Sequence, residues 1–144
     1  MNLVAALITF VIPSPAKPVL DIPYLVEAIR QVEHSRIDYV SPTGARGVYQ
    51  LKQRTWEEYS RQPFAWASDR TYVAQQETKR VALKHAHWVL EKAIPALKIA
   101  PTPYSFALVW GPGYGNVDKL NLTDDNVDYA HRVENVYEQL IRSN

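Results

Sequence analysis

Apolar residues recur at helical spacing along most of this chain, and prolines and turn residues separate one such stretch from the next. The first stretch follows Asp21, a helix-capping residue type, and has Pro23 in its first turn, where proline is tolerated. Its apolar residues are Ile22, Leu25, Val26, Ile29 and Val32. This spacing predicts a helix that ends between residues 34 and 37.

The longest uninterrupted helical pattern covers residues 71–93, and the prolines that follow it predict a loop. A short helix through Tyr59 is expected before it, with Thr55 and Glu58 as a capping box, and a last helix is expected over residues 125–142. The buried stripe of the long helix would consist of Ala82, Ala86, Val89 and Ala93. Because strand signals are weak throughout, the sequence predicts a mainly α fold.

A glycine-rich run and a pair of histidines are the two features that could indicate a cofactor or metal site. The glycine-rich run 111–115 follows a short apolar segment, 104–110, that could be a helix or a strand. No Gly-Lys-Ser/Thr follows this run, so it is not a phosphate-binding loop. His85 and His87 are two residues apart and point in different directions on a helix, so we interpret them as surface or edge histidines. Neither feature therefore indicates a metal or a nucleotide site.

Composition limits the class of protein. The 144 residues, 47% hydrophobic and 22% charged, have the size and balance of one globular domain. Sixteen Lys and Arg against 15 Asp and Glu leave a net charge of +1 without a long basic run, so no nucleic-acid partner is expected. The chain has no cysteine, which excludes disulfides and a thiolate nucleophile and leaves the redox compartment open.

The first 17 residues form a separate segment. Residues 3–12 are apolar apart from Thr9, but they are too short for a membrane span, which takes about 20 residues. Small residues follow, as at a signal-peptide cleavage site, yet no Lys or Arg precedes the apolar run. We interpret residues 1–17 as signal-like, an anchor, or an arm that packs on the domain or a partner chain, and residues 18–144 as the folded domain.

Glu33 is an unusual residue for its position. It lies four residues after Ile29, so on a helix it continues the apolar stripe. Burial and the negative end of the helix macrodipole would both favour its protonated form, which is the form that a general acid requires. The alternative is a glutamate at the edge of the stripe, paired with Arg30, Arg36 or Arg46.

The surroundings of Glu33 resemble a known pattern. Glu33-His34-Ser35 is followed at residues 41–50 by Ser-Pro-Thr-Gly-Ala-Arg-Gly-Val-Tyr-Gln. These residues are similar to the helix-terminal Glu-Ser and the Ser-x-x-Gly-Ala-x-Gly-Leu-Met-Gln loop of the soluble lytic transglycosylase family, relatives of goose-type lysozyme. Residues 107–117 resemble its Ala-Tyr-Asn-Ala-Gly-x-Gly-x-Val block, and residues 129–133 resemble its Tyr-Val-x-Arg-Val helix. Together the blocks lie within residues 22–140.

Several residues depart from the family pattern. His34 replaces a serine, Val48 and Tyr49 replace Leu-Met, and Trp110 replaces a tyrosine. Gly111 stands where the family has an asparagine whose amide helps to hold substrate near the acid. This last departure bears on substrate affinity and on the subclass to which the chain would belong.

The resemblance implies a single lysozyme-like domain that cleaves the bond between N-acetylmuramic acid and N-acetylglucosamine in peptidoglycan. One glutamate, here Glu33, would protonate the leaving oxygen and then deprotonate the C6 hydroxyl, which closes a 1,6-anhydro ring. The substrate's own 2-acetamido group would stabilise the cationic centre, and no metal or cofactor is needed. Substrate contacts are expected from Ser41, Tyr49, Gln50, Trp110 and Tyr129.

Each of these contacts has a structural alternative. Ser41 could be an ordinary turn residue, Gln50 a surface residue, and the three aromatic residues core residues, the role that we assign to Trp88 and Tyr137. Gly44 and Gly47 are expected to serve backbone geometry. The alternative functions are a hydrolysing muramidase and a glycan-binding or assembly protein that has lost turnover.

The implied substrate places the protein in the bacterial periplasm or cell wall, or on a phage particle. Such an enzyme could open the wall locally during secretion-system assembly or phage infection. Residues 1–17 would then contact an envelope-complex or virion partner.

Overall fold

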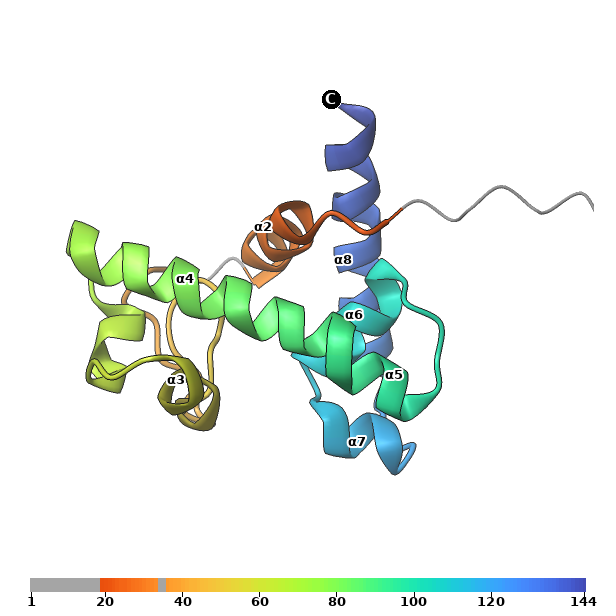
Figure 1. Cartoon of the computed structure of the whole chain (residues 1–144), viewed down its shortest axis with the longest axis horizontal. Coiled ribbons are helices and arrows are strands. Elements are labelled where there is room, and N and C mark those ends of the chain that lie inside the picture. Colours follow the sequence, from red (N-terminus) through yellow and green to blue (C-terminus); the bar gives the residue numbers. More distant parts are fainter. Residues whose placement is uncertain (1–18, 34–35) are drawn as a thin grey trace, which may run out of the picture.

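The computed structural model describes residues 19–33 and 36–144, and most of these residues lie in helices (Figure 1). In chain order the helices are α2 (Ile22–Glu33), α3 (Gln53–Tyr59), the 3-10 helix η1 (Phe64–Ser68), α4 (Tyr72–Trp88), the π-helix η2 (Val89–Ala93), α5 (Ile94–Leu97), α6 (Pro103–Trp110), α7 (Tyr114–Asp118) and α8 (Asp124–Arg142). Among the described residues, β-pairing is limited to isolated bridges, Val40 with Arg46 and Arg46 with Leu51. The mainly α prediction is confirmed.

Helix α2 begins where the sequence predicts. Asp21 Oδ1 accepts a hydrogen bond from the Tyr24 backbone N–H at 2.9 Å, which satisfies a free donor of the first turn. The Asp21 N–H in turn donates to the Tyr137 hydroxyl at 2.9 Å and ties this helix start to α8. Tyr137 is buried, as its assignment to the core requires. The buried face of α2 consists of Leu25, Val26, Ala28, Ile29 and Val32.

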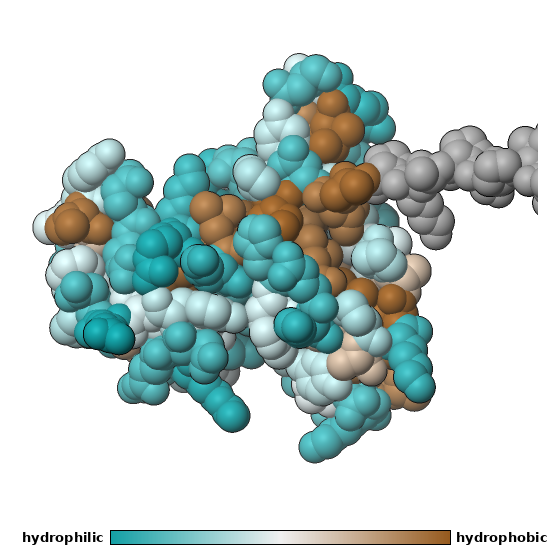
Figure 2. Space-filling model, viewed as in Figure 1, coloured by the Kyte–Doolittle hydropathy of each residue, from teal (hydrophilic) through white to brown (hydrophobic). Residues whose placement is uncertain are grey.

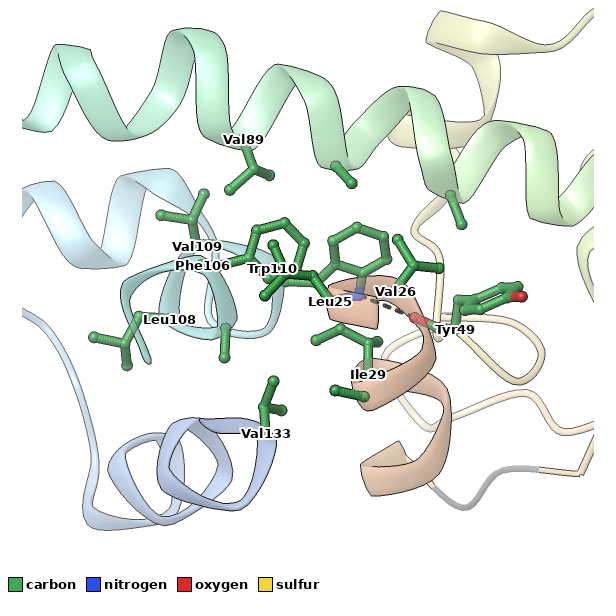
Figure 3. Packing of buried hydrophobic residues seen from close by; sticks show 14 of the residues in the cluster. Leu25, Val26, Ile29, Tyr49, Val89, Phe106, Leu108, Val109, Trp110 and Val133 are labelled. Carbon is green, nitrogen blue, oxygen red and sulfur yellow. Dashed lines mark hydrogen bonds between the residues drawn. The ribbon is translucent and has the colours of Figure 1, made fainter. Parts of the chain in front are cut away.

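Helix α6 lies at the centre of the core (Figure 3). All residues from Ser105 to Trp110 are buried, and they pack against α2, α8 and η2. A capping box between Thr102 and Ser105 starts this helix and resolves the choice between helix and strand. Burial of each large apolar side chain in this core contributes roughly 1.5–3 kcal/mol.

Helix α4 extends across the molecule from α3 to α5 (Figure 1). The Thr71 hydroxyl accepts a hydrogen bond from the Ala74 N–H and caps its start. The chain stays helical through η2 and α5, so the loop that the prolines predict begins later than expected, at residues 98–102, and Pro95 lies within the helical stretch. Pro95 is the second residue of α5 and follows the π-helix η2 closely, and the helix is capped by Lys98, whose φ is 57°. The predicted stripe of Ala82, Ala86, Val89 and Ala93 is buried.

The predicted capping box at Thr55 is wrong. Helix α3 begins two residues earlier, after Lys52, and no side chain caps it, so Thr55 lies within the helix. Helices η1 and α7 were not expected from the sequence, whereas α8 begins one residue before its predicted start. The Thr123 hydroxyl and the Asn126 side chain form its capping box.

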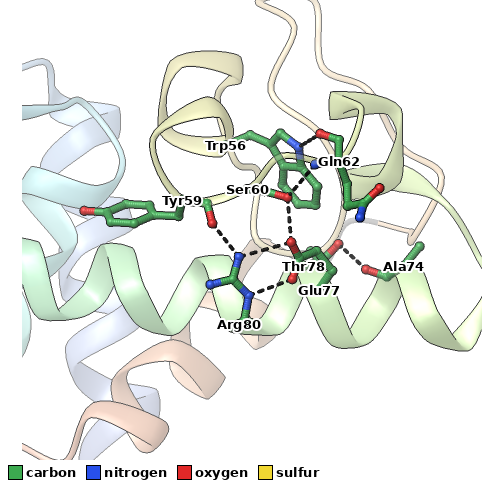
Figure 4. A network of polar contacts seen from close by, with 8 residues as sticks. All are labelled: Trp56, Tyr59, Ser60, Gln62, Ala74, Glu77, Thr78 and Arg80. Carbon is green, nitrogen blue, oxygen red and sulfur yellow. Dashed lines mark hydrogen bonds and ion pairs between the residues drawn. The ribbon is translucent and has the colours of Figure 1, made fainter.

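Polar contacts hold α3 against α4 (Figure 4). The Trp56 indole donates to the Gln62 carbonyl at 2.7 Å, and the Ser60 hydroxyl donates to the Glu77 carboxylate at 2.6 Å. The Arg80 guanidinium bridges Glu77 and the Tyr59 carbonyl. These contacts fix α3 and the loop after it on one end of α4.

The two ends of α4 carry different groups of helices. Helices α3 and η1 lie at one end, and α5, α6 and α7 lie at the other (Figure 1). Figure 2 shows a largely hydrophilic face that is hollowed between these groups. Across residues 19–33 and 36–144, no helix is long and apolar enough to cross a membrane. The interpretations of residues 1–17 lie outside the described residues. The predicted end of the first helix, at residues 34–37, lies partly outside them, because residues 34 and 35 are not described.

Candidate functional site

Glu33 is the last residue of α2, at the end of its buried face, and its side chain is partly buried. Burial raises the pKa of its carboxyl above the ordinary value, and this effect exceeds the lowering by the Tyr129 phenol and the Arg132 guanidinium. The raised pKa is the direction expected for a carboxyl that continues an apolar stripe. Glu33 is therefore disposed to hold a proton at a higher pH than an exposed glutamate.

Tyr129 of α8 is the aromatic neighbour of Glu33. Its hydroxyl is buried and makes no hydrogen bond of standard geometry among the described residues, although it lies near enough to lower the pKa of Glu33. Burial and the Glu33 carboxyl together raise the pKa of the Tyr129 phenol well above its ordinary value, so the phenol stays protonated. A protonated phenol can donate a hydrogen bond to the Glu33 carboxylate. It cannot act as a base that deprotonates the Glu33 carboxylic acid.

Gly111, at the end of α6, packs directly on Tyr129. A Cβ at position 111 would lie 2.7 Å from Tyr129 Cε1, closer than such atoms approach, and 3.1 Å from Cδ1, which is also a tight contact. An asparagine at this position would therefore collide with the tyrosine ring in this arrangement. Glycine here allows the ring to lie against the backbone beside Glu33.

The loop before α3 depends on two glycines in the left-handed region. Gly44 has φ of 89° and Gly47 has φ of 75°, conformations that side chains rarely adopt, so their assignment to backbone geometry is confirmed. A Cβ on Gly47 would lie 2.0 Å from the Ala67 carbonyl oxygen, because the loop packs against η1. The Gln50 side chain donates to the Gly47 carbonyl at 2.8 Å and closes the turn.

A pocket of about 610 Å³ lies between α3 and α7 and is walled by α4 and α6. Gln50 and Trp110 line it, as do Lys52 and Arg54 from the start of α3. Glu33 does not line this pocket. Gly111 connects the two places, because its Cα faces the Tyr129 ring and its carbonyl accepts a hydrogen bond from Lys52 Nζ at 3.3 Å.

Aromatic side chains form one wall of the pocket. The rings of His85 and Trp88 are stacked, with centroids 5.6 Å apart and planes 11° apart. Trp110 lies 4.8 Å from His85 and Tyr114 lies 6.4 Å from Trp88, both with tilted rings. Burial, with a smaller effect from the Lys52 ammonium, lowers the pKa of His85 to about 4, so its imidazole is neutral at pH 7.

This wall bears on two predictions. Trp88 is not a core residue, since it is 38% exposed at the edge of the pocket. The interpretation of both histidines as surface or edge residues holds for His87, which is exposed and pairs with Glu91 at 3.2 Å, whereas His85 is half-buried and lines the pocket between Trp88 and Trp110. The two histidines therefore do diverge, as their spacing predicts. Among the described residues no group of His, Cys, Asp and Glu is arranged to hold a metal ion.

The predicted substrate residues are only partly brought together. Gln50 and Trp110 line the pocket and Tyr129 lies beside Glu33. The Ser41 hydroxyl accepts a hydrogen bond from the Ala45 N–H at 3.0 Å and supports its own turn. The Tyr49 side chain lines a smaller cavity of about 230 Å³, while its carbonyl accepts a hydrogen bond from the Trp110 indole at 3.2 Å. Tyr49 therefore does not line the larger pocket.

Sequence reasoning missed Lys52, His85 and Trp88 as pocket residues. The one signal for the last two was their spacing of three residues, which places both side chains on one face of a helix. The sequence matches no known family model and no curated protein, and the structure matches no solved structure.

Proposed function

We propose that this protein has a lysozyme-like fold and is a lytic transglycosylase of peptidoglycan, with Glu33 as its one general acid and base. The observation that carries the proposal is the partly buried Glu33 carboxyl at the end of α2, whose pKa burial raises, beside the protonated phenol of Tyr129. A carboxyl that both gives and takes a proton works best with a pKa closer to the working pH than that of an exposed glutamate.

The proposed reaction begins with protonated Glu33, which gives its proton to the glycosidic oxygen as the bond from that oxygen to C1 breaks. The substrate's 2-acetamido group stabilises the positive charge at C1. The Glu33 carboxylate then takes the proton of the C6 hydroxyl while the C6 oxygen bonds to C1. The 1,6-anhydro ring is closed, and Glu33 is protonated again for the next turnover.

The residues around Glu33 support the second step as well as the first. The Arg132 guanidinium and the Tyr129 phenol both lower the pKa of Glu33, opposing the effect of burial. They therefore stabilise the carboxylate that forms when the glycosidic bond has broken. Such opposing influences keep both protonation states accessible, which a group with two roles requires.

The pocket between α3 and α7 would hold the sugar rings of the glycan strand. Its aromatic wall offers flat apolar surfaces, and Gln50 lies at the same pocket. Aromatic walls with a few polar groups are typical of small-ligand sites. The glycan would extend from this pocket past Gly111 to Glu33.

The proposed place of action is the bacterial periplasm or cell wall, or a phage particle that reaches the wall. An enzyme of this size would suit local opening of the wall, with residues 1–17 contacting an envelope or virion partner. The Gly111 exchange favours a second candidate, a glycan-binding protein without turnover, since the family's substrate-holding amide is missing. A hydrolysing muramidase is the third candidate.

Mass spectrometry of soluble products tests all three functions. Purified peptidoglycan is incubated with the intact protein, with Glu33→Gln and with Glu138→Gln, a matched control on the exposed side of α8. We expect anhydro-muropeptides from the wild type and the control and none from Glu33→Gln. Reducing-end products would identify a hydrolase, and binding of folded wild type without any product would identify the non-catalytic protein.

A further inference from the structure

The pocket combines an aromatic wall with two cations. Lys52 and Arg54 line it together with one carboxylate, Glu58, and the enclosed His85 is neutral at pH 7. The ionised side chains of the lining therefore leave a net positive charge. Its volume of about 610 Å³ falls within the usual range for small-ligand pockets. These properties fit a ligand with an apolar face and a negative charge.

The stacked pair of His85 and Trp88 provides the apolar face. Their planes differ by 11° and their centroids lie 5.6 Å apart, so the two rings are stacked and His85 supports one face of Trp88, which lines the pocket. Trp88 is 38% exposed although it is a large aromatic residue, and the rest of its ring is held by His85 and Tyr114. A flat, held aromatic surface suits the C–H face of a pyranose ring.

Lys52 provides the charge. Among the residues that the structure describes, its ammonium makes one hydrogen bond, to the neutral Gly111 carbonyl at 3.3 Å, and no ion pair. The ammonium lies close enough to His85 to lower the pKa of that imidazole, which places the charge next to the aromatic wall. A carboxylate is a stronger acceptor for an ammonium than a carbonyl. Lys52 is therefore able to exchange its long bond for an ion pair with a ligand.

We infer that this pocket binds an acidic amino sugar of the glycan strand, with the pyranose ring on Trp88, which His85 supports, and a carboxylate of the ligand paired with Lys52. This inference rests on the proposed function for the identity of the glycan. The carboxylate belongs either to the lactyl group of the sugar or to a peptide attached to it. Because Lys52 also contacts Gly111, the same exchange would free the Gly111 carbonyl at the junction between the pocket and Glu33.

The test measures binding without turnover. All variants carry Glu33→Gln in the full chain, and tryptophan fluorescence or calorimetry reports binding of three probes of equal ring number. These are a neutral oligomer of N-acetylglucosamine, a peptide-free peptidoglycan glycan and the same glycan with its peptides. We expect both acidic probes to bind about tenfold more tightly than the neutral oligomer at low salt, as for one charge-assisted hydrogen bond.

Lys52→Gln should remove the preference for acidic probes and keep binding of the neutral oligomer, while Lys92→Gln, an exposed lysine outside the pocket, should change neither. Trp88→Ala should weaken the binding of all three probes about fivefold, which is the effect of losing one aromatic contact. A preference for the peptide-bearing probe alone would assign the carboxylate to the peptide and still support the inference.

Equal binding of acidic and neutral probes, or an undiminished preference in folded Lys52→Gln, would overturn the inference. Because Glu33→Gln is used throughout, these outcomes do not depend on catalysis. A pocket that selects acidic glycans without any product from the wild type would instead overturn the proposed enzyme and keep the binding site.

Discussion

Gly111 and Tyr129 are in direct contact, with so little space between them that a Cβ on residue 111 would lie 2.7 Å from Tyr129 Cε1. The contact joins the end of α6 to α8 at the place where Tyr129 meets Glu33. It also gives a reason for the glycine at a position where the resembled family has asparagine. Glycine fits here because a Cβ would enter the space that the neighbouring ring occupies.

Gly111→Ala should destabilise the protein by about 1–3 kcal/mol, the usual cost of overpacking, because the Tyr129 ring must move. Replacing Tyr129 by alanine in the same chain should remove most of this cost. Urea unfolding of the two single variants and the double variant measures the coupling. Gly115→Ala is the matched control, since its Cβ would meet nothing within 4 Å in helix α7. Additive effects of Gly111→Ala and the Tyr129 change would contradict the contact.

Gly47→Ala should cost clearly more than Gly44→Ala. Both residues have positive φ, so each substitution adds backbone strain of about 1–2 kcal/mol. Only Gly47 adds a collision, at 2.0 Å from the Ala67 carbonyl oxygen, whereas the space beside Gly44 is open. Thermal or urea unfolding of both variants measures the difference. Equal losses of stability would show that the loop does not pack on η1 as described.

Glu33→Gln should stabilise the protein at neutral pH. The pKa of Glu33 is raised in the folded state above its ordinary value of 4.5, so the folded state takes up its negative charge less readily than the unfolded chain. The wild type is therefore penalised as pH rises above 4.5, and below that pH both states are protonated and the penalty vanishes. Unfolding at pH 4 and pH 7, with Glu138→Gln as control, measures this. A variant less stable than the wild type at pH 7 would contradict it.

His85 should make stability fall in acid. Burial lowers its pKa from 6.5 to about 4. Between pH 6.5 and pH 4 the imidazole is therefore protonated in the unfolded chain and neutral in the folded protein. The stability present above pH 6.5 is lost as pH falls towards 4, by up to about 3 kcal/mol at 1.36 kcal/mol for each pKa unit. His85→Gln should show a shallower decline in unfolding free energy over this range, and His87→Gln, an exposed control, should match the wild type. Parallel curves for His85→Gln and wild type would refute the assignment.

Local sequence patterns predicted the helices well where capping residues, proline and apolar spacing within one segment determine the helix. Asp21 and Pro23 start α2 at the expected place, and the stripe of Ala82, Ala86, Val89 and Ala93 is buried. Local rules failed at Pro95 and Thr55, which lie within helices. In both places packing of the neighbouring segments extends a helix past a residue that local propensity would place at a boundary.

Part of the candidate site was predictable from the sequence and part was not. The position of Glu33 on the stripe predicted a carboxyl with a raised pKa, because burial of a helix face follows from spacing alone. The pocket wall was not predictable, since His85 and Trp88 meet Trp110 and Tyr114 from other helices. Ser41 and Tyr49, expected at the substrate, instead stabilise a turn and line another cavity.

By itself the sequence determined the helical character of the chain, the start of α2 and the buried end at Glu33, because spacing, capping and proline act within a few residues. Only the tertiary structure decided which residues surround that glutamate and which line the pocket. The contact of Gly111 with Tyr129 and the bond from Lys52 to Gly111 join residues that are 18 and 59 positions apart in the chain. Such contacts depend on how whole helices pack, and no local pattern specifies them.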